Sequence, residues 1–111
     1  MFFTRDFITT ALALAFSATR AEATIAIGTF NNFNVIWVDG GDPCRWTIIN
    51  NRPANPCNVH LANPLTNGFK YVLQGCGGSL WLKNYDGSFN SNCHDAPANL
   101  ACGVHWEWVC S

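Results

Sequence analysis

The sequence predicts an all-β fold, a small antiparallel β-sandwich or barrel that is stabilised by disulfides and has little or no helix. Short segments alternate apolar and polar side chains at the two-residue period of a β-strand. Clusters of Gly, Pro, Asn and Asp separate these segments at short intervals, as turns do. The third observation is an even set of widely spaced cysteines, typical of a disulfide framework: Cys44, Cys57, Cys76, Cys93, Cys102 and Cys110.

Residues 1–23 have the composition of a secretory signal peptide. A basic n-region is followed by a mostly apolar run over 7–18, and Ala21-Glu22-Ala23 offers the small side chains that a signal peptidase accepts. A membrane span needs about 20 apolar residues, and Arg20 interrupts this run too early. We expect cleavage after Ala23, so that residues 24–111 form a single cysteine-rich β domain that is secreted into an oxidising, extracellular compartment.

The alternation places strand candidates at residues 24–29, 30–38, 44–50, 59–65, 69–74, 79–85, 88–90 and 104–110. The first of these is β-branched but terminal, so it opens a strand or remains a mobile terminus. The candidate at 59–65 is a weak edge strand, because Pro64 cannot donate to a sheet ladder. In the candidate strand 30–38, one face carries Phe33, Val35 and Trp37.

Turn residues account for the connections between these segments. Residues 39–43 and 50–58 are rich in Gly, Pro, Asn and Asp. Asn67-Gly68 is the clearest hairpin signal, because a type I′ turn needs positive φ at both positions, and Asp86-Gly87 is a second hairpin-type turn. We expect residues 91–103 to be irregular, with one helical turn that has Pro97 at its first position.

Two of the predicted strands separate their side chains clearly between two faces. In the segment 79–85, one face carries Leu80, Leu82 and Asn84, and the other carries Trp81, Lys83 and Tyr85. In the final segment, one face carries Val104, Trp106, Trp108 and Cys110, and the other carries His105, Glu107 and Val109. The final strand therefore has a tryptophan-lined face and a more polar face.

The predicted register suggests one disulfide, Cys57–Cys76. These residues lie directly opposite each other if the connecting loop spans residues 65–68, and on a diagonal if the loop is shorter. A Cys93–Cys102 bond would close a small loop, and a Cys44–Cys110 bond would tie the last strand to the early sheet. Spacing alone does not decide among the fifteen pairings that six cysteines allow.

Charge and composition exclude several classes of function. From residue 24 onward the chain has four basic and five acidic side chains, which argues against nucleic-acid binding by a basic patch and against a cationic membrane-lytic peptide. His60, His94 and His105 are scattered, without the paired spacing of a zinc site, so we expect no metal and no other cofactor. An even cysteine count leaves no spare thiol for catalysis.

One pair of residues has the chemistry of a general acid and base. His105 and Glu107 lie on the same face of a regular strand, and such a pair works in small secreted nucleases, with Arg45 or Arg52 positioned to stabilise a phosphate. A solvent-facing polar edge opposite a tryptophan-lined core explains the same residues more simply. The sequence therefore predicts no catalytic residue.

Five tryptophans are a large number for a domain of this size: Trp37, Trp46, Trp81, Trp106 and Trp108. Most of these rings are expected to fill space between sheets. If Trp106 and Trp108 face inward, then Trp81 with Tyr85 is the better exposed pair. Aromatic side chains with a polar tip suit protein interfaces and sugar-stacking surfaces, so this pair is the predicted binding site.

The Ala21-Glu22-Ala23 site, the short mature chain and the six cysteines together resemble the small cysteine-rich secreted proteins of fungi, including effector candidates. This resemblance is to a class, and it implies action outside the producing cell, often against a host or a competitor. The near-neutral charge departs from the cationic antifungal members of that class. No functional residue carries over, because no motif matches.

We therefore expect a non-enzymatic, effector-like protein that binds a protein or glycan target outside the cell and is a monomer. One alternative is a carbohydrate- or cell-wall-binding module that uses exposed Trp and Tyr side chains. The other alternative is a small ribonuclease-like hydrolase that uses His105 and Glu107.

Overall fold

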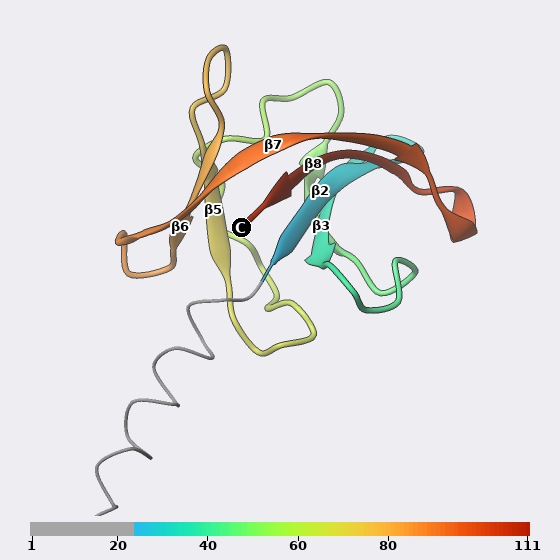
Figure 1. The fold of residues 1–111 in the computed structure, drawn as a ribbon, viewed down its shortest axis with the longest axis horizontal. Coiled ribbons are helices and arrows are strands. Elements are labelled where there is room, and N and C mark those ends of the chain that lie inside the picture. Colours follow the sequence, from blue (N-terminus) through green and yellow to red (C-terminus); the bar gives the residue numbers. More distant parts are fainter. Residues whose placement is uncertain (1–23) are drawn as a thin grey trace, which may run out of the picture.

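Residues 24–111 are described by a computed structural model, and nearly all of them belong to antiparallel strands and their connections (Figure 1). The strands are β2 (Ile25–Phe30), β3 (Phe33–Val38), β4 (Thr47–Asn51), β5 (Tyr71–Gln74), β6 (Trp81–Asn84), β7 (Phe89–Asn99) and β8 (His105–Cys110). They form one sheet in the order β4-β3-β2-β8-β7-β6-β5, which curls into a half-barrel. The predicted class, a small all-β fold with disulfides, is confirmed.

The inner face of the curled sheet carries the main core. Ile25, Ile36 and Leu82 are almost completely buried there, on three different strands. The long connection between β4 and β5 packs against this face and buries Leu61 and Leu65. The predicted strand at 59–65 is therefore wrong: the segment is irregular, as its proline favours, but its leucines close the open side of the half-barrel.

A second cluster covers the opposite face of β2, β3 and β8. Trp37 and Val104 are buried in it, and the Trp37 ring lies 6.1 Å from that of Trp106. Phe30 packs against Trp46, with ring centroids 5.1 Å apart. Because both faces of these three strands are covered, most of the aromatic side chains serve as packing, as the sequence predicts for most of the tryptophans.

A β-bulge in β8 changes which residues share a face. Ile27 is opposite Trp108 while the next residue, Gly28, is opposite Trp106, so Glu107 is an extra residue in the ladder. Trp108 consequently packs with Cys110 against the inner core, whereas Trp106 belongs to the outer cluster. The prediction that these tryptophans share one face is wrong, because a bulge interrupts strict alternation.

The longest strand, β7, lies where the sequence predicts a short return strand and an irregular segment. Its eleven residues continue through Pro97, which sits at a register shift between Asp95 and Ala98. Beyond Cys93, the strand partner of β7 among residues 24–111 is β8 alone, and a proline is tolerated where a strand has an open side. The predicted helical turn is wrong in position, since Pro97 belongs to β7 and the 3-10 turn η2 covers Ala101–Gly103.

Smaller differences concern strand ends and turns. The predicted segment 30–38 is divided by a tight turn at Asn31 and Asn32, so that β2 and β3 form a hairpin. Residues 25–30 are a strand rather than a mobile terminus, because they lie between β3 and β8. The turn at Asn67-Gly68 exists, but positive φ occurs only at Gly68, so it is not type I′.

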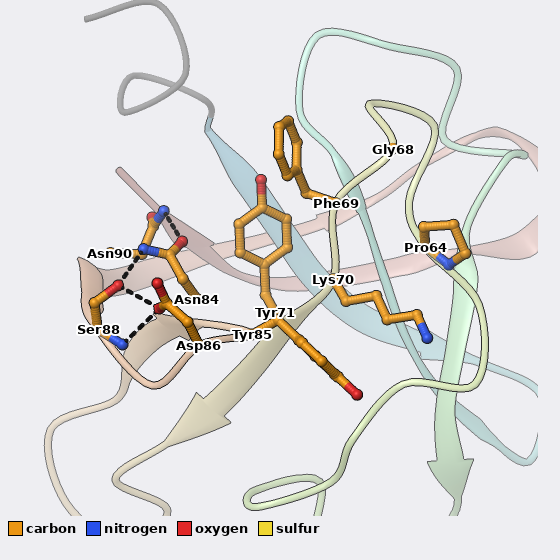
Figure 2. Close-up of a pocket in the computed structure, with 10 residues that line it drawn as sticks. All are labelled: Pro64, Gly68, Phe69, Lys70, Tyr71, Asn84, Tyr85, Asp86, Ser88 and Asn90. Atoms are coloured by element: carbon orange, nitrogen blue, oxygen red, sulfur yellow. Dashed lines mark hydrogen bonds between the residues drawn. The ribbon is translucent and has the colours of Figure 1, made fainter. Parts of the chain in front are cut away.

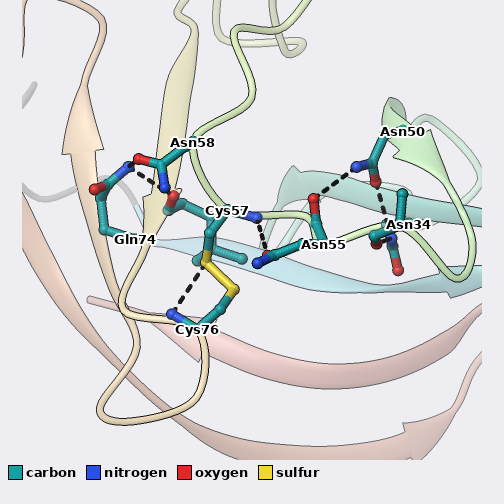
Figure 3. The surroundings of a disulfide bond; sticks show 9 residues. Asn34, Asn50, Asn55, Cys57, Asn58, Gln74 and Cys76 are labelled. Carbon is teal, nitrogen blue, oxygen red and sulfur yellow. Dashed lines mark hydrogen bonds between the residues drawn. A yellow bond between two sulfur atoms is a disulfide. The ribbon is translucent and has the colours of Figure 1, made fainter.

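Three disulfides join all six cysteines: Cys44–Cys102, Cys57–Cys76 and Cys93–Cys110. The predicted Cys57–Cys76 bond is confirmed, and it ties the long connection to the turn after β5 (Figure 3). The predicted Cys93–Cys102 and Cys44–Cys110 pairings are wrong. Because β7 is a strand aligned with β8, Cys93 lies directly opposite Cys110, and Cys44 bonds to Cys102 in the η2 turn.

The expected signal peptide, residues 1–23, lies outside the described residues. Within residues 24–111, the structure has no helix with the length and apolar character of a membrane span.

Candidate binding groove

A groove of about 750 Å³ lies where the start of β5, the end of β6 and the start of β7 meet (Figure 2). Tyr71 pairs with Asn84 in the antiparallel register of β5 and β6, so the turn before β5 and the turn after β6 lie side by side. Side chains from both turns line the groove, with Phe69 on one and Tyr85 and Asp86 on the other.

Two large aromatic side chains at this groove remain exposed to solvent. Tyr85 is 58% exposed and Phe69 is 43% exposed. The Tyr85 and His60 rings are nearly perpendicular, with 5.7 Å between their centroids, and the Lys70 Nζ atom lies 5.5 Å from the centre of the Tyr85 ring. These contacts orient the Tyr85 ring while leaving much of its surface open.

Tyr71 presents a polar group at the groove from a ring that is otherwise in the core. The residue is 3% exposed, and its hydroxyl oxygen accepts a hydrogen bond of 3.0 Å from Asn67 Nδ2. The Asn67 side chain is itself fixed, because its Oδ1 accepts a hydrogen bond of 3.0 Å from the backbone N–H of Phe69. Burial raises the pKa of Tyr71, so the phenol keeps its proton and can donate it to a ligand.

The opposite wall is a chain of hydrogen bonds that ends at a carboxylate (Figure 2). Asn90 Nδ2 donates to Asn84 Oδ1 at 2.9 Å, and Asn84 Nδ2 donates to Ser88 Oγ at 3.0 Å. The Ser88 hydroxyl and backbone N–H both donate to Asp86 Oδ1, at 2.6 and 2.9 Å. These bonds lower the pKa of Asp86, with the hydroxyl contributing most, and they leave the second carboxylate oxygen facing solvent.

The two predicted binding residues, Trp81 and Tyr85, have different surroundings. Tyr85 lines the groove, whereas Trp81 is half-buried on the outer face of β6 and stacks on Phe89 at 5.8 Å. Phe69 and Tyr71 were not predicted. The available signal was the glycine-rich corner at residues 75–78, which joins the segments 69–74 and 79–85 as antiparallel neighbours and so brings Phe69 close to Tyr85.

The residues proposed for acid–base chemistry lie away from this groove. His105 is exposed on β8, with its Nδ1 atom 2.8 Å from Asn99 Oδ1. Glu107 lines a smaller cavity of about 230 Å³ together with Trp108 and Cys76. Within residues 24–111, no group of three or more His, Cys, Asp or Glu side chains is placed to hold a metal ion.

The fold and its cross-links define a class, that of small, disulfide-stabilised, all-β proteins of the extracellular type. Comparison with known proteins finds no matching family model, no matching curated protein and no matching solved structure.

Proposed function

We propose that this protein is a secreted, non-enzymatic binding protein of the effector-like kind, which acts as a monomer outside the producing cell. Its target is a component of a host, a competitor or a cell surface, and the binding site is the groove at Tyr85. The signal-peptide pattern and the three disulfides support an extracellular location.

The observation that carries this proposal is the pair of exposed rings, Phe69 and Tyr85, at one groove. Leaving large apolar side chains in water forgoes the stabilisation of burying them, and exposed aromatic side chains are enriched where proteins bind partners. The groove is also braced. Leu65 N–H donates to Phe69 O at 2.9 Å, and Asn67 Oδ1 accepts the Phe69 N–H at 3.0 Å, so the turn that carries Phe69 needs little ordering on binding.

The lining of the groove favours binding over catalysis. In the described part of the chain it contains one carboxylate, Asp86, and one ammonium group, Lys70, and no histidine or cysteine. Asp86 already accepts two hydrogen bonds from Ser88 on one oxygen, and its lowered pKa makes it a poor general base near neutral pH. A site of this composition holds a ligand by stacking and hydrogen bonds.

A binding measurement with two matched variants tests the proposal. The mature protein would be passed over panels of immobilised extracellular proteins, peptides and polysaccharides, with Tyr85→Ala and Phe89→Ala beside it. Phe89 is 59% exposed, close to the value for Tyr85, but does not line the groove. We expect Tyr85→Ala to lose a wild-type interaction that Phe89→Ala retains. Equal binding by the two variants, or cleavage of RNA that is abolished by His105→Ala, would contradict the proposal.

A further inference from the structure

We infer that the groove at Tyr85 binds a sugar residue of a neutral glycan. This inference rests on the proposed function and names the chemical class of the ligand. It comes from the combination of exposed rings and fixed polar groups in a single open groove of about 750 Å³, which is large enough for a sugar ring with its neighbours along a chain.

The aromatic groups supply the apolar part of the site. One face of a pyranose ring presents C–H groups, which pack against an aromatic ring without leaving a hydroxyl unsatisfied. Tyr85 and Phe69 are the two exposed rings at the groove, and His60 and Lys70 hold the Tyr85 ring in place. A preformed ring position reduces the conformational entropy lost when the sugar stacks.

The polar groups match the hydroxyls of a sugar, each of which donates one hydrogen bond and accepts others. The Tyr71 hydroxyl already accepts a bond from Asn67, so its own proton is free for an oxygen of the ligand. Tyr71 lines the groove and is 3% exposed, so its ring is held firmly beside the ligand site. On the opposite wall, both hydrogen bonds to Asp86 reach Oδ1, which leaves Oδ2 as an acceptor for a sugar hydroxyl.

The charges that line the groove favour a neutral glycan over anionic ligands. Among residues 24–111, Lys70 and Asp86 are the only charged residues that line the groove, and their charges are opposite. Nucleic acids and polyanionic polysaccharides are held by several Lys or Arg side chains, and a carboxylate in the site repels them. Their binding would moreover depend strongly on salt, whereas stacking and neutral hydrogen bonds would not.

The experiment uses defined soluble probes with the mature protein. Hexasaccharides of N-acetylglucosamine, β-linked glucose and mannose are the neutral probes, an oligogalacturonate is the acidic probe, and a random peptide library is the protein-like probe. Binding is measured by calorimetry and mapped by backbone amide shifts in nuclear magnetic resonance spectra. We expect at least one neutral hexasaccharide to bind, with the largest shifts at Phe69, Lys70 and Tyr85.

Variants then assign the binding to the groove. We expect Tyr85→Ala or Phe69→Ala to weaken the affinity about tenfold or more, the usual effect of removing an aromatic anchor. Tyr71→Phe and Asp86→Asn keep the shape of the groove, and we expect these variants to weaken the affinity by a smaller factor. Phe89→Ala and Ile48→Ala, which alter exposed apolar residues outside the groove, should leave the affinity within about twofold. Near-ultraviolet circular dichroism would verify that each variant is folded.

The outcomes separate this inference from the proposed function. Binding of peptides that depends on Tyr85, with no binding of any neutral hexasaccharide, overturns the glycan inference and leaves the proposed function standing. Preference for the oligogalacturonate has the same consequence. Absence of any interaction that depends on Tyr85 overturns both. Glycan binding that is lost in Phe89→Ala and kept in Tyr85→Ala overturns the assignment to this groove and places the sugar on the Trp81–Phe89 stack.

Discussion

A missing side chain at Gly28 allows the central strands β2 and β8 to approach each other at the bulge. A Cβ atom at this position would collide with the carbonyl oxygen of His105, which belongs to the backbone and cannot rotate away. The residue is buried, and the register between β2 and β8 shifts directly beside it. Glycine is therefore required here by close contact between two backbones.

The first prediction follows from this contact. We expect Gly28→Ala to destabilise the fold by about 1–3 kcal/mol, because the strands must separate or the bulge must rearrange. For a domain of this size, that corresponds to a fall in melting temperature of about 4–8 °C for each kcal/mol. Thermal unfolding followed by circular dichroism measures it. The matched control is Gly78→Ala, where the added Cβ has room and φ is ordinary. Equal melting temperatures for the two variants would refute the explanation.

The second prediction concerns the acidic residue of the groove. Ser88→Ala removes the hydroxyl that contributes most to the lowered pKa of Asp86, so that pKa should rise toward the ordinary value for aspartate. A pKa lower in the folded chain than in the unfolded chain gives stability that is present above the unfolded value and is lost as pH falls through the folded value. Titration of the Asp86 carboxyl carbon by nuclear magnetic resonance measures the shift. Ser79→Ala, another exposed serine, is the control, and an unchanged Asp86 pKa in Ser88→Ala would contradict the prediction.

The residues of the groove show which parts of the site can be predicted from the alternation of apolar and polar residues and which cannot. Alternation placed Tyr85 on the face of its segment opposite Leu80 and Leu82, and the structure exposes it. Phe69 and Tyr71 were missed because their role depends on the pairing of β5 with β6, and the turn chemistry at Asn67-Gly68 suggested a different neighbour. Which strand pairs with which is decided by the whole sheet, and local periodicity does not contain that information.

At the scale of elements, strands with regular alternation were predicted and irregular ones were not. The inner and outer faces of β6 agree with the prediction, since Leu82 is buried inside and Trp81 lies outside. In β7, Pro97 and the run of polar residues give no strand pattern in the sequence. The segment is a strand because it pairs with β8. That one omission also explains the two wrong disulfides, because only a strand at 89–99 brings Cys93 opposite Cys110.

The third prediction tests the disulfide that encloses the longest segment. Cys44 and Cys102 are 58 residues apart and both exposed, so replacing them with alanine removes a cross-link without emptying the core. Loop-closure entropy predicts a loss of about 4 kcal/mol, against about 3 kcal/mol for a loop of the length closed by Cys57–Cys76. Denaturant unfolding of the double variant measures the loss.

The same variant should loosen the outer cluster first. The Cys44–Cys102 bond ties the segment that holds Trp46 to the η2 turn beside the outer cluster. We expect faster hydrogen exchange at residues 39–46 and 100–104. The amides of β5 and β6 should exchange no faster than the loss of global stability alone requires. Uniformly faster exchange across the sheet would instead show that the two faces unfold as one unit.

At the scale of the molecule, one curled sheet supports two packed clusters through shared strands. β2, β3 and β8 are covered on both faces, by the inner core on one side and by the outer aromatic cluster on the other. The inner core needs the long β4–β5 connection as its cover, and that connection has little regular structure of its own. Disulfides therefore fix two segments that are not strands of the sheet. Cys57 fixes the β4–β5 connection, and Cys44 fixes the segment that contains Trp46.

The last prediction follows from this dependence on cross-links. The bonds close segments of 58, 19 and 17 residues, and each contributes about 3–4 kcal/mol by restricting the unfolded chain. The loops overlap, so the contributions do not add fully, but their sum approaches the total net stability of about 5–15 kcal/mol that a domain usually has. We therefore expect reduction and alkylation of the thiols to abolish both the near-ultraviolet signal of the packed tryptophans and cooperative thermal unfolding. Protein incubated with oxidised dithiothreitol is the control. A reduced chain that keeps both signals would show that the half-barrel and its irregular cover are stable by packing alone, and the disulfides would then no longer be needed to explain the fold.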